Sequence, residues 1–146
     1  MKYGFVDMNG NVKIPVVYDD TSDSFSEGLC AACYTKYDTQ GNIVSKDWFF
    51  INEANETVLT FKGGVYISQG FSEGLAVIAR ESEYYGCEYI DKTGKTIIAS
   101  DEWTHDVGSF KNGLAVVSNS IAGGPPDMYA SVTFGVIKRI APNRPA

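Results

Sequence analysis

Three cysteines and one histidine are the side chains best suited to hold a metal ion. Cys30 and Cys33 form a Cys-x-x-Cys pair, and Cys87 with His105 would complete a set of three cysteines and one histidine, which is a common zinc coordination. All four ligands must converge for such a site, whereas residues three apart on a strand point to opposite faces of the sheet. We therefore expect the cysteines to be core side chains, and we predict no bound metal.

Asp7, Asn9 and Asn11 have the spacing that opens a calcium-binding loop. The twelfth loop position, where such a loop needs a glutamate with both oxygens on the ion, is Tyr18. Asp7 is also followed three residues later by Gly10, and this spacing is typical of a tight turn because the carboxylate can accept backbone N–H groups. We therefore predict a turn rather than a calcium site.

Few residues suggest catalysis. The carboxylate pairs Asp19–Asp20 and Asp101–Glu102 could support glycoside hydrolysis only at a fixed separation, and we interpret both as parts of solvated loops. The single histidine, His105, lies in a polar segment, and no nucleophile, base and orienting group can be assembled around it. We predict that the chain is not an enzyme and has no cofactor, with a hydrolase kept as the third functional alternative.

Aromatic side chains are the strongest candidates for ligand binding, since they can stack on sugars or anchor a peptide. Most of them recur at equivalent positions of an internal repeat, where we expect core packing. The aromatic residues that remain as candidates for binding are Trp103, Tyr66, Tyr84 and Tyr85.

Composition limits the class of protein. The 146 residues carry 18 acidic and 12 basic side chains, which gives a formal net charge of −6, and 44% of the residues are hydrophobic. The hydrophobic share indicates a folded chain, and the acidic balance argues against nucleic acid and anionic membranes as partners. No apolar run approaches the roughly 20 residues that a membrane helix requires, so we predict no membrane insertion.

The odd number of cysteines and the N-terminal residues favour a cytoplasmic location. An odd count does not form a complete disulfide framework, and residues 1–7 lack the apolar segment of a signal peptide. An extracellular or surface location stays open if a leader or a longer parent chain is missing.

Two sequence blocks recur along the chain. Residues 25–29 (Phe-Ser-Glu-Gly-Leu) return as residues 71–75 and, in a weaker form, as residues 110–114, at spacings of 46 and 39 residues. A second block keeps the same phase and begins at Tyr3, Trp48, Cys87 and Phe134. Periods of 20–50 residues indicate repeat architectures.

We therefore predict a single repeat domain over residues 1–146. It contains three full repeats and the start of a fourth, with approximate bounds 3–47, 48–86, 87–133 and 134–146.

The local pattern within each repeat is typical of β-structure. Short apolar runs such as residues 75–79 are bounded by turn residues, and no segment shows a sustained helical period. We predict an all-β fold of tandem antiparallel β-meander repeats, with three strands per repeat and one more at the end, ten in total. The repeats could form an open twisted array or a propeller-like closure.

The two blocks resemble the WG-repeat family of bacterial proteins. The first copy supplies the family pattern in residues 3–7, in Gly10, in Ile14-Pro15, in the Tyr-Asp-Asp segment 18–20 and in residues 25–29. The Trp-Gly pair itself is never intact, and Pro15 has no counterpart in the later copies. The resemblance implies a β-repeat architecture, no shared catalytic residues, and binding of other proteins or ligands.

These observations together predict a non-catalytic binding or scaffolding module whose partner is a protein. A module that binds carbohydrate or a surface ligand is the alternative. Self-association through exposed edge strands is a further expectation, because an unpaired strand edge can pair with another chain.

Overall fold

The computed structural model describes residues 1–80, 86–100, 107–120 and 132–138. These residues form twelve β-strands and no helix, in agreement with the predicted all-β class. The described part of the chain therefore holds no helix able to cross a membrane.

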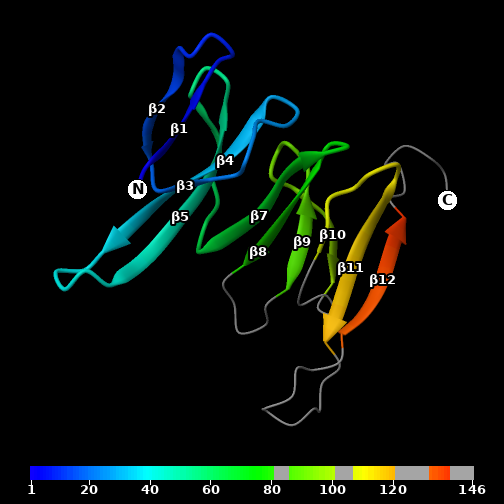
Figure 1. The fold of residues 1–146 in the computed structure, drawn as a ribbon. Coiled ribbons are helices and arrows are strands. Elements are labelled where there is room, and N and C mark those ends of the chain that lie inside the picture. The colour runs from blue at the N-terminus through cyan, green and yellow to red at the C-terminus, as the bar shows by residue number, and fades with distance from the viewer. Residues whose placement is uncertain (81–85, 101–106, 121–131, 139–146) are drawn as a thin grey trace.

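The strands form four antiparallel sheets that lie in a series from one end of the molecule to the other (Figure 1). Within each sheet the strands follow one another in chain order. Sheet 1 contains β1 (Tyr3–Val6) and β2 (Val12–Tyr18); sheet 2 contains β3 (Asp20–Thr21), β4 (Leu29–Tyr37), β5 (Ile43–Asn52) and β6 (Thr57–Leu59); sheet 3 contains β7 (Val65–Ser72), β8 (Leu75–Arg80), β9 (Cys87–Ile90) and β10 (Thr96–Ser100); sheet 4 contains β11 (Leu114–Ser120) and β12 (Val132–Lys138).

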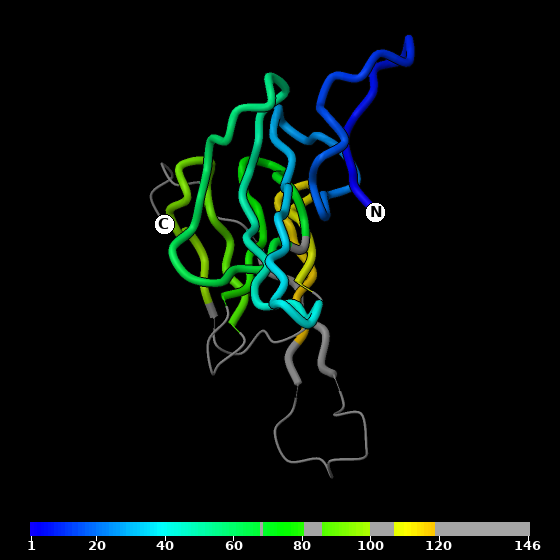
Figure 2. Tube along the Cα trace, turned by 90° about the vertical axis from the view of Figure 1, so that its left-hand side faces the viewer, coloured from blue at the N-terminus to red at the C-terminus, as the bar shows by residue number. Residues whose placement is uncertain are grey.

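The series is open in the described residues. Sheet 1 stands at one end and sheet 4 at the other (Figure 1), and no strand of one pairs with a strand of the other. Figure 2 shows the β1–β2 hairpin projecting away from the rest of the chain. Of the two predicted arrangements, the structure therefore has the open array.

The predicted number of ten strands is wrong, because the described residues alone contain twelve. The additional strands are β3, which precedes the first Phe-Ser-Glu-Gly-Leu block, and β7, which leads into the second block and ends at its serine. β3 is only two residues long and polar, so no alternation of apolar and polar residues marks it in the sequence.

Each sequence repeat is shared between two sheets. The second repeat, for example, supplies β5 and β6 to sheet 2 and β7 and β8 to sheet 3. Consecutive repeats are thus joined by strand pairing as well as by side-chain packing.

The pairing that joins one repeat to the next has the same register in three sheets. Ile51 lies opposite Cys30, Ile90 opposite Ala76 and Ile137 opposite Ala115, and the three preceding pairs follow in step. In each of these three sheets, the strand that begins a repeat therefore pairs with the same positions of the strand that ends the previous repeat.

The turn predicted at Asp7 is confirmed. Its carboxylate accepts hydrogen bonds from the backbone N–H groups of Asn9 and Asn11, both at 2.9 Å. These bonds lower the pKa of Asp7, the Asn11 N–H having the largest effect. The same arrangement occurs at three further positions, namely Asp38, Asn52 and Asp91.

Apolar side chains fill the three spaces between successive sheets. We call the recurring blocks at residues 25–29, 71–75 and 110–114 the corners. In each space an aromatic ring from the strand that begins a repeat packs on the phenylalanine of the next corner, with ring centroids 4.8–4.9 Å apart. The three pairs are Phe5–Phe25, Phe50–Phe71 and Tyr89–Phe110.

The cysteines belong to three different apolar clusters. Cys30 lies between sheets 1 and 2, Cys33 between sheets 2 and 3, and Cys87 packs against the cluster between sheets 3 and 4. Burial raises the pKa of all three thiols. The predicted role of Cys30 and Cys33 as core side chains on opposite faces of one strand is thus confirmed.

Candidate functional site

Of the four aromatic residues predicted to bind a ligand, the structure places Tyr66. It lies on β7 and its side chain is 54% exposed. Trp103, Tyr84 and Tyr85 lie outside the described residues.

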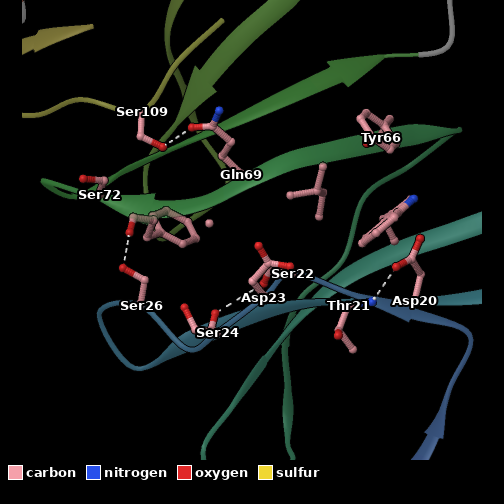
Figure 3. A pocket seen from close by; sticks show the side chains of 14 residues that line it. Asp20, Thr21, Ser22, Asp23, Ser24, Ser26, Tyr66, Gln69, Ser72 and Ser109 are labelled. Carbon is pink, nitrogen blue, oxygen red and sulfur yellow. Dashed lines mark hydrogen bonds between the residues drawn. The ribbon is translucent and has the colours of Figure 1, made fainter. Parts of the chain in front are cut away.

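Tyr66 lines a groove of about 400 Å³ between sheets 2 and 3. The ring of Trp48, from β5, meets Tyr66 edge-on, with centroids 5.7 Å apart and an interplanar angle of 85°. The rest of the lining is rich in hydroxyl, amide and carboxylate groups (Figure 3); it includes Asp20, Thr21, Ser22, Asp23, Ser24, Ser26, Gln69, Ser72 and Ser109. The groove thus combines an aromatic wall with many polar groups.

One polar atom of the groove lacks a partner. Trp48 is only 7% exposed, and among the described residues its Nε1–H has no hydrogen-bond acceptor. A buried donor without an acceptor costs about 1–3 kcal/mol. The recurrent aromatic position of Trp48 predicts core packing, which the structure confirms, but the missing acceptor depends on neighbours from other strands and leaves no sequence signal.

A second feature is a ladder of hydrogen bonds between successive corners. The hydroxyl of Ser26 donates to the carbonyl of Phe71, and the hydroxyl of Ser72 donates to the carbonyl of Phe110, both at 2.6 Å. The next residue in each corner is a glutamate whose carboxylate accepts the glycine N–H of the following corner: Glu27 from Gly74 at 3.0 Å and Glu73 from Gly113 at 3.1 Å.

The glutamates of the ladder have an uncommon backbone conformation. Glu27 has φ of 53° and Glu73 of 50°, a left-handed region that favours glycine and asparagine. The bond to the next corner helps to offset this cost. The third corner has Lys111 and Asn112 at the serine and glutamate positions, and no further corner follows it among the described residues. This difference between the copies is the sequence signal of the ladder.

The open end of the series is the third feature. In sheets 2, 3 and 4 the strand that begins a repeat (β5, β9 or β12) pairs with the strand that ends the previous repeat. β1 is the corresponding strand of sheet 1, and among the described strands only β2 pairs with it. One edge of β1 is therefore unpaired in the described structure.

A cavity of about 440 Å³ adjoins this edge, lined by Phe5, Val6, Lys13, Ile14, Phe25 and Glu53. Phe5 and Phe25 are only partly buried, whereas the corresponding ring pairs in the next two spaces are fully buried. Four valines of the hairpin are also exposed, by 42–63%: Val6, Val12, Val16 and Val17. We call the β1 edge, this cavity and these valines the open end.

Comparison with protein families identifies the repeat. The family model for WG-containing repeats matches residues 3–36, from β1 into β4, and residues 89–120, from β9 to the end of β11. Searches of curated proteins and of solved structures found no match. Both matched segments begin in the strand that opens a repeat and extend through the next corner, as the sequence blocks predict. The resemblance to WG-containing repeats is therefore confirmed for these two segments of the chain.

Proposed function

We propose that the chain is a non-catalytic binding and scaffolding module whose partner is a protein, and that the partner docks on the open end. The observation that carries this proposal is the unpaired edge of β1 beside a cavity and four exposed valines. Exposed strand edges are sites where a further strand can add to a sheet. Exposed apolar side chains next to the edge supply the contact area that stabilises such a complex.

The chemistry of the described residues supports binding rather than catalysis. The three thiols belong to separate apolar clusters, and burial raises their pKa, which disfavours the nucleophilic thiolate. The carboxylates of Asp7, Asp38 and Asp91 accept backbone hydrogen bonds within their own turns.

The test is capture of proteins from a lysate of the source organism by the intact chain and by two double variants. We expect Val6→Lys with Val16→Lys to abolish capture, because two ammonium groups would have to be buried against the partner. The matched control is Ile43→Lys with Val44→Lys, which changes two residues of similar exposure, 57% and 65%, in the β4–β5 hairpin. Equal capture by both double variants would contradict docking at the open end.

A neutral polyhydroxylated ligand, such as a carbohydrate, is a second candidate, and it would bind in the groove. The half-exposed ring of Tyr66 beside many hydroxyl groups favours it. Sugars present hydroxyl oxygens as acceptors and C–H faces that pack on aromatic rings.

Titration with a panel of mono- and oligosaccharides, followed by intrinsic fluorescence, tests the groove. Tyr66→Ala is expected to weaken binding about tenfold through loss of the aromatic contact. Tyr37→Ala, which removes a ring of similar exposure (58%) from the end of β4, is expected to leave it unchanged. A panel without any binding sugar would eliminate this candidate.

A further inference from the structure

We infer that the open end receives a β-hairpin of another WG repeat, one that carries a Ser-Glu-Gly-Leu corner. The strand after that corner pairs with the free edge of β1, as β4 pairs with β5 and β8 with β9. This inference rests on the proposed function and names the chemistry of the protein partner. Three separate features of the open end match this occupant.

The first feature is the edge of β1 and its register. In sheets 2, 3 and 4 the fourth residue of the repeat, which is Ile51, Ile90 or Ile137, lies opposite a small residue, Cys30, Ala76 or Ala115. Val6 is the corresponding residue of β1, and it is 63% exposed, whereas Ile51 and Ile90 are fully buried. A strand with alanine or cysteine opposite Val6 would complete sheet 1 in the same register.

The second feature is the cavity beside Phe5 and Phe25. In the next two spaces, the leucine that follows the corner packs into the cluster that holds the corresponding ring pair. Leu29 packs with Phe50 and Phe71, and Leu75 lies in the cluster of Tyr89 and Phe110. The cavity of about 440 Å³ lies beside Phe5 and Phe25, so the leucine of an incoming corner would occupy it.

The third feature is the first corner, which offers both groups that a preceding corner would bind. Phe25 and Gly28 correspond to Phe71 and Gly74, whose carbonyl and N–H bind Ser26 and Glu27. Within the described part of the chain, no hydrogen bond uses the Phe25 carbonyl or the Gly28 N–H. A serine hydroxyl and a glutamate carboxylate complement this pair of groups.

The charges around the cavity predict whether a charge substitution there strengthens or weakens binding of the hairpin. The Nζ of Lys92 lies 3.2 Å from Oε1 of Glu27, so a lysine supports the ladder glutamate there. The position of Lys92 is taken by Glu53 one repeat earlier, and Glu53 lines the cavity. An incoming glutamate would therefore be repelled by Glu53, and Glu53→Lys would replace this repulsion by an ion pair.

The experiment uses the intact chain and a fluorescent peptide with the sequence of residues 65–80, which carries the corner and both of its strands. The matched control is the same peptide with Ser72→Ala and Glu73→Gln, which keeps length and apolar content. We expect saturable binding by anisotropy, at least about tenfold weaker for the control peptide. Glu53→Lys in the protein should strengthen binding of the first peptide by several-fold and leave the control peptide unchanged.

Equal binding of both peptides, or no binding at about 1 mM, would overturn the inference. A dimer of the intact chain that forms through the open end and is not displaced by the peptide would also overturn it, in favour of a second copy. If the Val6→Lys, Val16→Lys variant loses its captured proteins while the peptide does not bind, the inference fails and the proposed function stands. If capture is also insensitive to that variant, both fail.

Discussion

Replacement of Phe71 by alanine is expected to lower the free energy of unfolding by about 3–5 kcal/mol. Phe71 is fully buried between sheets 2 and 3, and its ring lies 4.9 Å from that of Phe50. The smaller side chain would leave a cavity lined by residues of both sheets, because the surrounding structure relaxes only partially around a deleted ring.

Phe25→Ala is the matched control for this prediction. Phe25 occupies the corresponding corner position and contacts Phe5 at the same 4.9 Å, but it is only partly buried at the open end. We expect a clearly smaller loss, measured by denaturant unfolding monitored by near- and far-ultraviolet circular dichroism. Equal losses for the two variants would show that the space between sheets 2 and 3 is no better packed than the open end.

The second large effect is expected at Gly4, where alanine should lower the free energy of unfolding by about 1–3 kcal/mol. A Cβ atom at this position would lie 2.6 Å from the carbonyl oxygen of Ile14 and 2.7 Å from that of Pro15. Both atoms belong to the backbone of β2, where the pairing with β1 is irregular on either side of Phe5. Relief of the overlap therefore requires the hairpin backbone to move.

Gly70→Ala is the control for Gly4→Ala, measured in the same unfolding experiment. A Cβ at Gly70 would meet only the Cβ of Ser26, at an ordinary distance of 3.9 Å, so a change within about 0.5 kcal/mol is expected. A loss at Gly70 as large as that at Gly4 would mean that backbone overlap is not the reason for the effect.

Gly4 also gives a physical reason for part of the repeat pattern. The Pro15 segment of β2 approaches β1 so closely that only glycine fits opposite it. The second and third copies lack this proline and have Phe49 and Glu88 at the glycine position. The glycine and the proline of the first copy are thus absent together in the second and third copies.

The sequence allowed the all-β class, the repeats, the Asp7 turn and the core positions of Cys30 and Cys33 to be predicted. These features depend on local chemistry or on side-chain alternation, both of which can be read along one chain. The strand β3 was missed because two polar residues carry no such pattern. Tyr66, a candidate for ligand binding, is 54% exposed, but the unpartnered N–H of Trp48 was not foreseen.

By itself, the sequence determined which residues form turns, which residues are buried, and that one repeat unit recurs along the chain. Only the tertiary structure decided that each repeat is divided between two sheets, that Ser26 and Glu27 bind the following corner, and that the β1 edge has no strand beside it. The reason is that turns and alternation are local properties, whereas the acceptor of the Ser26 hydroxyl and the donor to the Glu73 carboxylate belong to residues 45 and 40 positions away. Repetition in the sequence indicates that such contacts recur, and the structure shows which atoms make them.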